Sequence, residues 1–231
     1  MKPLLRYLPL LLFCSLPLAN AQYPHRHDSD EPGPFNFAIG FGSASDASNG
    51  GGIETNQNSL NAFGPCTVSS ADPTCVRNPA LAHFFMGFDG DAMLNKRVGF
   101  GGELIFTPGR SNYGPLLYRQ EFYDFNGLFV PLANKHFSVR LEGGIGGAHS
   151  GFALSQTGCV GTAVCSTQTL PVGSSNHFQE HLGAGVEVYL TRHIFIRPQF
   201  DYHHVHGFTD QFNSANVPMG SVWLGYNFGE Y

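Results

Sequence analysis

Strict alternation between apolar residues and small or polar residues is the feature that most constrains the fold. From Phe35 to Gly42, every second residue is Phe or Ile, and the residues between them are Asn, Ala and Gly. A period of two is the repeat of a β-strand, whose successive side chains point to opposite faces. The pattern returns in seven further segments, two of them noisier: about 80–94, 98–106, 117–132, 137–145, 182–190, 194–202 and 222–228. The sequence therefore predicts an all-β chain with eight strands.

The connections between these segments have two lengths, and the lengths alternate along the chain. Short turns are expected near 95–96, 133–135 and 191–192, and long loops near 43–79, 108–117, 149–176 and 207–216. Transmembrane barrels show this asymmetry, with short periplasmic turns and long extracellular loops. We therefore predict an eight-stranded antiparallel up-and-down transmembrane β-barrel.

The residues opposite the apolar face favour a membrane barrel over a soluble one. They are mainly Gly, Ala, Ser and Asn with isolated charges, and only 13% of the chain is charged. A water-facing surface would need more Lys, Glu and Thr, so we assign the apolar face to lipid and the other face to the lumen. Aromatic residues near strand ends are expected to form interfacial girdles: Phe35, Phe106, Tyr118, Phe137, Tyr202 and Phe228. A secreted soluble β-barrel that binds an apolar ligand stays an alternative.

The N-terminus is typical of an export signal. Lys2 and Arg6 precede an apolar run from Leu8 to Leu18, and Ala19-Asn20-Ala21 is a suitable cleavage site. We predict a cleaved Sec-type signal peptide over 1–21, a flexible periplasmic tail over 22–33 and a barrel domain over 34–231. The formal net charge of −5 and the lack of a basic run disfavour a nucleic-acid partner.

Four cysteines follow the signal segment, in two Gly-, Ser- and Thr-containing stretches of the expected long loops. Cys66 lies close to Cys75, and Cys159 lies close to Cys165. An even number in an exported chain predicts two local disulfides, 66–75 and 159–165, in segments that resemble neither strands nor helices. A zinc site is disfavoured, because the spacing lacks the C-x-x-C pattern.

The chain resembles the small eight-stranded OmpA/OmpX-like outer-membrane barrels of Gram-negative bacteria. The resemblance depends on the export signal, the strand count, the loop asymmetry and the closing segment Val222-Trp223-Leu224-Gly225-Tyr226-Asn227-Phe228. It implies location in the outer membrane, contact with its lipid, and recognition of an assembly signal by the barrel-assembly machinery: Trp223, Gly225, Tyr226 and Phe228. The chain departs from the family in continuing to Tyr231 and in placing Pro198 inside a strand, where we expect a bulge.

The interior of an eight-stranded barrel is just wide enough to be filled by side chains. Strand parity assigns the following charged residues to the lumen: Asp89, Glu103, Asp124, Arg140, Glu142, Glu187, Arg197 and Asp201. Isolated charges in such a space need partners, so a salt-bridged plug is predicted. A narrow channel or small-solute porin is the alternative function.

Histidines near the outer strand ends provide weak candidates for a Zn²⁺ or Cu²⁺ site: His177, His181 and His203, with Asp201. His177 and His181 would lie about 13 Å apart along one strand, too far to share one ion. The favoured interpretation is polar rim residues, with no metal and no cofactor.

Catalysis is not predicted. The His-x-Ser pairing of the barrel lipid A deacylases is absent, because His149 and Ser150 are adjacent and point to opposite faces. The predicted lumen is also too charged for an acyl chain. We expect an integral outer-membrane protein with a structural or surface-interaction role, whose long loops would contact an unidentified surface ligand.

Overall fold

The computed structural model describes residues 34–44, 52–54, 75–77, 81, 84–113, 116–160, 164–212 and 214–228. The predicted signal peptide and tail, Cys66 and residues 229–231 lie outside the described residues. The strands are β1 (Phe35–Ala44), β2 (Gly52–Glu54), β3 (Cys75–Arg77), β4 (Phe85–Met93), β5 (Val98–Phe106), β6 (Ser111–Tyr113), β7 (Leu116–Ala133), β8 (Phe137–Val160), β9 (Val164–Tyr189), β10 (Ile194–Val205) and β11 (Asn216–Phe228). A short 3₁₀ helix, η2 (Phe208–Asp210), precedes β11.

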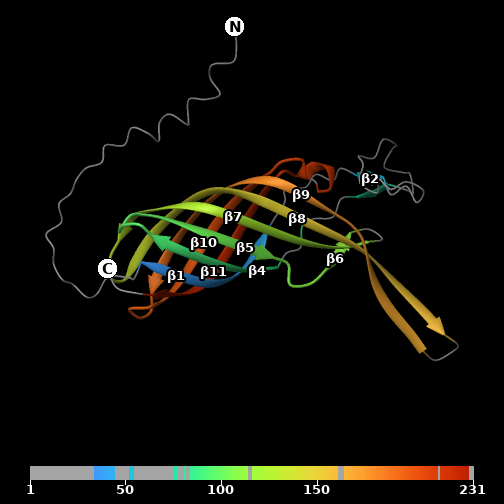
Figure 1. The fold of residues 1–231 in the computed structure, drawn as a ribbon, viewed down its shortest axis with the longest axis horizontal. Coiled ribbons are helices and arrows are strands. Elements are labelled where there is room, and N and C mark those ends of the chain that lie inside the picture. Colours follow the sequence, from blue (N-terminus) through green and yellow to red (C-terminus); the bar gives the residue numbers. More distant parts are fainter. Residues whose placement is uncertain are drawn as a thin grey trace, which may run out of the picture.

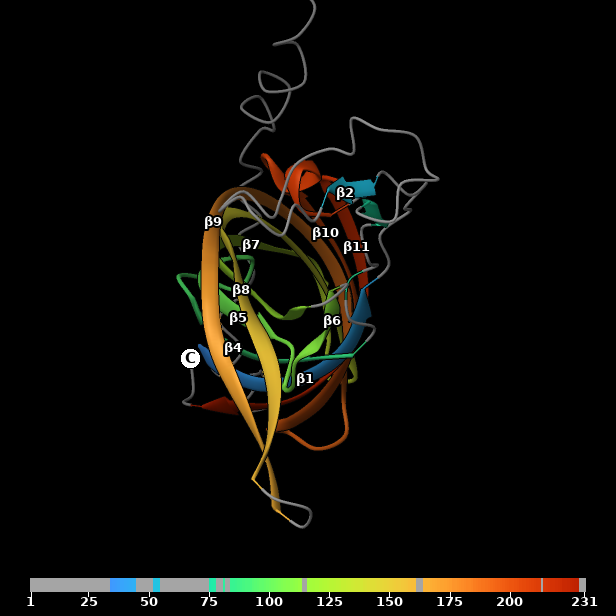
Figure 2. The ribbon, with the colours of Figure 1, turned by 90° about the vertical axis from the view of Figure 1, so that its right-hand side faces the viewer.

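Eight of the strands form a closed antiparallel ring, as predicted. The order is β1-β4-β5-β7-β8-β9-β10-β11, and β11 pairs again with β1. Phe35 at the start of β1 faces Phe228 at the end of β11, so the first and last ring strands close the barrel. Figure 2 shows the ring nearly end-on. Each of the eight predicted segments supplies one ring strand, and the fold class is confirmed.

Helices contribute little to the part of the chain that is described. No helix in that part is long and apolar enough to cross a membrane.

The three short turns share one local structure, which explains why they lie where the sequence places them. Asn95 Oδ1 accepts hydrogen bonds from the backbone N–H groups two and three residues later, at 2.8 and 3.0 Å. Asn134 Oδ1 does the same at 2.8 and 2.9 Å, and Thr191 Oγ1 at 3.3 and 3.0 Å. These side chains stabilise tight turns because they satisfy backbone donors that the sheet leaves unpaired.

The predicted loop over 149–176 is wrong: most of it is a β-hairpin. β8 and β9 remain paired from Phe137↔Val188 to Val160↔Val164, well beyond the barrel wall. Figure 1 shows the two strands projecting as an arm from one end of the barrel. The Ser-, Thr- and Gly-rich composition concealed this arm, because without a buried face its two-residue alternation of apolar and polar residues disappears.

Three cysteines lie in strands, contrary to the prediction that their segments resemble neither strands nor helices. Cys75 lies in β3, and Cys159 and Cys165 lie in β8 and β9. Cys159 and Cys165 are direct register partners across the hairpin, which is the placement that the 159–165 disulfide requires. Both disulfides stay predictions, because Cys66 and the side chains of Cys75 and Cys159 lie outside the described part.

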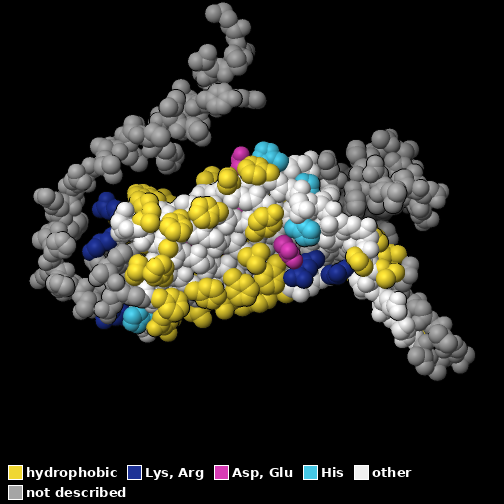
Figure 3. Space-filling view, viewed as in Figure 1, with side chains coloured by type: hydrophobic (Ala, Val, Ile, Leu, Met, Phe, Trp, Pro, Cys, Tyr) yellow, Lys and Arg dark blue, Asp and Glu magenta, His cyan; other side chains and the backbone are white. Residues whose placement is uncertain are grey.

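The outer wall of the barrel carries a belt of exposed apolar and aromatic side chains. Phe35, Phe125 and Leu224 are 56%, 63% and 57% exposed, and many others on the ring strands are similar. Figure 3 shows this belt, with Lys and Arg side chains at the end that carries the short turns and others beside acidic and histidine side chains near the opposite end. An apolar patch of this size on a single chain needs an apolar environment. The assignment of Tyr118 to the girdle is wrong, because it is 1% exposed and points into the lumen.

Pro198 causes no bulge, contrary to expectation. The β10–β11 register is continuous through Pro198↔Val222, and the β9 pairing skips positions 197 and 198 without a shift. Pro198 has no backbone N–H, and β10 accommodates this by losing pairing with β9 at that point while keeping its pairing with β11. Register shifts lie instead between Phe129 and Leu132, around Pro131, and between Phe152 and Ala153.

Trp223 shows why the lumen-facing positions are rich in glycine. Its indole is 1% exposed and lies across the inward faces of β1 and β4. A Cβ on Gly40 would lie 2.4 Å from the ring, and one on Gly87 would lie 2.7 Å from it. The two glycines therefore provide the room that the largest side chain of the lumen occupies.

We expect Gly40→Ala to lower the free energy of unfolding by about 1–3 kcal/mol, because the new methyl group overlaps Trp223. Urea unfolding in lipid vesicles, followed by tryptophan fluorescence, measures this. The matched control is Gly90→Ala on the neighbouring strand, where a Cβ meets nothing within 4 Å. Equal stability of the two variants would contradict the close packing described here.

Candidate functional site

The lumen concentrates the ionisable chemistry of the described residues. Its buried charged residues are seven carboxylates and two arginines: Asp89, Asp91, Glu103, Asp124, Glu142, Glu187 and Asp201, with Arg140 and Arg197. All eight residues assigned to the lumen by parity are buried there. Asp91, two positions from Asp89 on β4, was missed, although the same parity could have found it.

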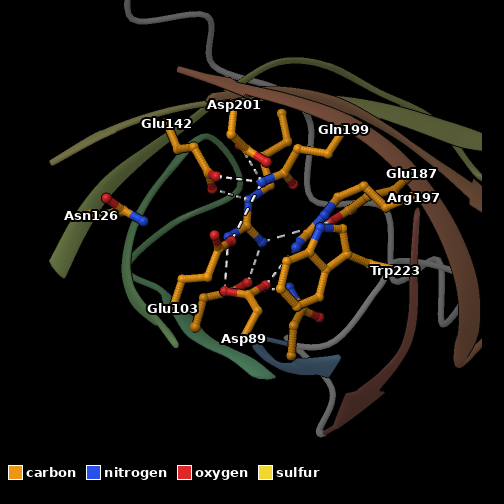
Figure 4. A network of polar contacts seen from close by, with 12 residues as sticks. Asp89, Glu103, Asn126, Glu142, Glu187, Arg197, Gln199, Asp201 and Trp223 are labelled. Carbon is orange, nitrogen blue, oxygen red and sulfur yellow. Dashed lines mark hydrogen bonds and ion pairs between the residues drawn. The ribbon is translucent and has the colours of Figure 1, made fainter. Parts of the chain in front are cut away.

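The two arginines organise the inner layer, toward the short turns. Asp89 lies between them, 3.3 Å from Arg140 Nη2 and 2.7 Å from Arg197 Nη2. Arg140 also pairs with Asp91, and its Nε lies 2.9 Å from Glu142. Figure 4 shows Asp89, Glu142 and Arg197 of this network converging from different strands. The Arg140 guanidinium is buried with several acceptors, whereas Arg197 has one hydrogen bond, to Asp89, and a longer ion pair with Glu187 at 3.5 Å. Opposite charges at this distance are what make a buried charge tolerable away from water.

The Trp223 ring covers one side of this layer. The guanidinium carbon of Arg197 lies 5.4 Å from the indole centroid, within the range of a cation–π contact. The indole N–H donates to Ser221 Oγ at 2.9 Å. Trp223, predicted as part of an assembly signal, thus also packs the lumen, whereas Tyr226 and Phe228 lie on the outer wall.

A second polar layer lies further out and contains more acids than bases. Gln199 Nε2 lies 2.7 Å from Glu142 Oε1, 2.7 Å from Asp201 Oδ1 and 3.4 Å from Glu103 Oε2. His181 Nε2 lies 3.2 Å from Asp201 Oδ1, and its Nδ1 lies 3.0 Å from Asn126 Oδ1. Figure 4 shows Glu142, Gln199 and Asp201 pointing toward one another across this layer.

The four metal candidates predicted from the sequence separate into two places. His181 and Asp201 are in direct contact in the second layer. His203 stacks on His181 with a centroid distance of 4.6 Å, but neither of its ring nitrogens has a hydrogen-bond partner. His177 lies nearer the mouth, where it contacts the backbone carbonyl of His206 at 3.0 Å. Glu103, the acid that completes a ligand-like group with His181 and Asp201, comes from the opposite wall and has no sequence proximity to either.

Aromatic side chains close the outer end of the lumen. The ring centroids of Phe208 in η2 and Phe212 lie 4.5 Å apart, and both side chains are fully buried. Tyr118 packs edge-on to Phe212, and Phe122 packs on both Phe208 and His203. The predicted long loop over 207–216 therefore folds back into the barrel mouth. Sequence alternation could not show this, because these residues belong to a loop.

Comparison with known proteins finds the fold but no sequence relative. No family model and no curated protein matches the chain. Among solved structures, neisserial surface protein A is 8% identical, with 85% of this chain and 98% of that chain covered and a TM-score of 0.51. Ail of Yersinia pestis is 15% identical, with 85% and 99% covered and a TM-score of 0.44. The protease OmpT of Escherichia coli is 11% identical, with 85% and 97% covered and a TM-score of 0.40.

The chain therefore has the fold of the small outer-membrane β-barrels. The expected OmpA/OmpX-like resemblance is confirmed at the level of architecture.

We expect Arg140→Ala to lower the free energy of unfolding by about 3–5 kcal/mol, since it leaves several buried carboxylates without their cation. Conductance in planar bilayers should stay at the baseline, because the aromatic cluster still closes the mouth. Arg119→Ala is the control: its pair with Glu121 is at the surface and contributes about 0–1 kcal/mol. A large rise in conductance with Arg140→Ala would support the channel alternative instead.

Proposed function

We propose that this chain is an integral protein of the bacterial outer membrane with a closed lumen, no catalytic activity and a structural or surface-interaction role. The observation that carries the proposal is the combination of an exposed apolar belt, a closed antiparallel ring and a charged interior. A soluble barrel would bury its apolar face and expose its charges. The soluble alternative with an apolar ligand inside is therefore disfavoured, because the lumen holds the charges.

Closure of the lumen supports a non-conducting barrel over a porin. Ions moving along the axis would meet the arginine layer, where Asp89 connects Arg140 to Arg197. They would then meet the aromatic cluster around Phe208 and Phe212, which offers no polar replacement for a hydration shell. Two consecutive obstacles of different chemistry favour a plug.

The arrangement of the polar residues supports a non-catalytic role. Ser221 Oγ lies 3.3 Å from Asp201 Oδ2, so this serine contacts the carboxylate and not the imidazole of His181. A catalytic serine needs the histidine as its base, with the acid behind it. Ser150 is fully buried and bonded to Gln120, whereas His149 contacts Asn176 at the surface. Neither of these serines therefore has a base in the position that acyl transfer requires. Ser175 Oγ does lie 3.2 Å from His177 Nε2, but His177 Nδ1 faces the backbone carbonyl of His206 at 3.0 Å and not a carboxylate.

The β8–β9 arm is the surface best placed to contact a partner. β7 pairs with β8 no further out than Leu154, whose partner on β9 is Leu170. Beyond this point β8 and β9 pair only with each other, over six residue pairs that end at Val160 and Val164. At the usual rise per residue, this free part extends about 20 Å. Its β9 side chains are exposed from Cys165 to Ser174. A paired, projecting hairpin presents a more fixed surface than an irregular loop of the same length.

The membrane assignment predicts a heat-modifiable band. Outer membranes should retain the protein after sarkosyl extraction, and unboiled samples should migrate faster than boiled ones, because a closed ring resists detergent unfolding. The predicted export signal is checked in the same cells by N-terminal sequencing. Recovery in the soluble fraction without a mobility shift would overturn the proposal.

Surface interaction predicts that the arm can be removed without loss of the barrel. Replacing 155–169 with Asn-Gly would join the register partners Leu154 and Leu170 through a two-residue turn. Cells carrying this variant should keep the heat-modifiable band but lose adherence to immobilised extracellular-matrix protein, relative to cells with the full chain. Unchanged adherence with raised detergent sensitivity would indicate a purely structural role.

A further inference from the structure

The second polar layer brings three ligand-type side chains together from three strands. Glu103 of β5, His181 of β9 and Asp201 of β10 each place one ligand atom within 4.8 Å of the other two. All three residues are buried, at 3%, 1% and 0% exposure. β5 is not a neighbour of β9 or β10 in the ring, so the group spans the lumen. Glu142, which pairs with Arg140, also lies 4.0 Å from His181 Nε2, so the group adjoins the arginine layer. The proposed function gives these three residues no individual role.

Unpartnered oxygen atoms point to a ligand at this level. Glu103 Oε1 and Gln199 Oε1 are buried and have no hydrogen-bond partner among the described residues. The Gln199 amide group lies between the carboxylates, and its nitrogen Nε2 contacts both Glu103 and Asp201. Buried oxygens of this kind are normally paired with a protein donor, an ordered water or a cation, and here two of them lie beside the three ligand-type side chains.

The charge of this layer also favours a cation. The ion pairs of the two arginines go to Asp89, Asp91, Glu142 and Glu187. Among the described residues, Glu103 and Asp201 lie within ion-pair distance of no lysine or arginine. Two carboxylates in a confined space without a strong cation repel each other, and a divalent ion removes that repulsion.

The orientation of His181 suits a metal ligand. Its Nδ1 faces Asn126 Oδ1 at 3.0 Å, so an Nδ1–H donated to Asn126 leaves the Nε2 lone pair directed at Asp201. A metal-bound histidine usually donates its other N–H to such an oxygen. The 3.2 Å separation between Nε2 and Asp201 Oδ1 matches two ligands that share an ion with bonds of about 2.0–2.2 Å.

We propose that Glu103, His181 and Asp201 bind one divalent transition-metal ion, such as Zn²⁺, in the middle of the lumen. One imidazole with two carboxylates favours Zn²⁺ over Mg²⁺ or Ca²⁺, which prefer oxygen alone. Glu103 closes the remaining distance by rotation of its flexible side chain. The ion would join opposite barrel walls at the level where the protein supplies fewest positive charges. His177 and His203 are not ligands.

The test uses the full mature chain refolded into detergent micelles with ZnCl₂ present, because the site is closed once the barrel forms. After desalting, mass spectrometry of the metal content should give about one Zn²⁺ per folded chain. Glu103→Gln should lower zinc affinity at least about tenfold. This variant keeps the shape of the side chain and breaks no ion pair. Asp201→Asn should have the same effect, and MgCl₂ should not replace ZnCl₂.

Surface histidines provide the matched control. His204 lies at the outer end of β10, His206 follows that strand directly, and His206 contacts the exposed Glu180 at 3.6 Å. The double variant His204→Gln/His206→Gln should keep its zinc. Loss of zinc in this control, unchanged zinc in both Glu103→Gln and Asp201→Asn, or no retained zinc in the unaltered chain would each overturn the proposal. All these outcomes are independent of adherence and conductance.

Discussion

Two buried guanidinium groups in a lumen filled by side chains are the interaction on which the rest of the barrel depends. Arg140 and Arg197 come from different strands and share Asp89 on a third, so the network connects the walls across the interior. Each charge is stable there only if its partners are in place, because desolvation of an unpaired ion is costly. The network therefore requires the strand register that supplies all of these side chains at one level.

The same layer explains the small residues around it. Trp223 covers Arg197, and Gly40 and Gly87 leave the space that the indole fills. Outside the ring, the opposite alternation places Phe, Leu, Ile and Val on the exposed outer wall. The barrel is thus inverted relative to a soluble protein, with its electrostatic interactions inside and its apolar surface outside. Its outer end changes character again, because η2 and Phe212 close the mouth with aromatic packing.

Much of the candidate site follows from strand parity. A residue two positions from an inward residue also points inward, so Glu103, Arg140 and Asp201 could be assigned to the lumen without coordinates. Parity does not say which inward residues meet across the ring. Glu103 lies at the same height in the barrel as His181 and Asp201 because of the stagger between strands. Sequence periodicity does not encode that stagger. For the same reason, His177 and His203 could not be separated from the group in advance.

The sequence alone determined the eight ring strands, the three short turns and the face of the barrel that carries the apolar side chains, because each of these depends on neighbouring residues. Only the tertiary structure decided the β8–β9 arm, the folding of Phe208 and Phe212 into the mouth, and the partners of each lumen charge. These features depend on contacts between residues far apart in the chain. Ring closure and stagger bring those residues together, and no local pattern specifies either one.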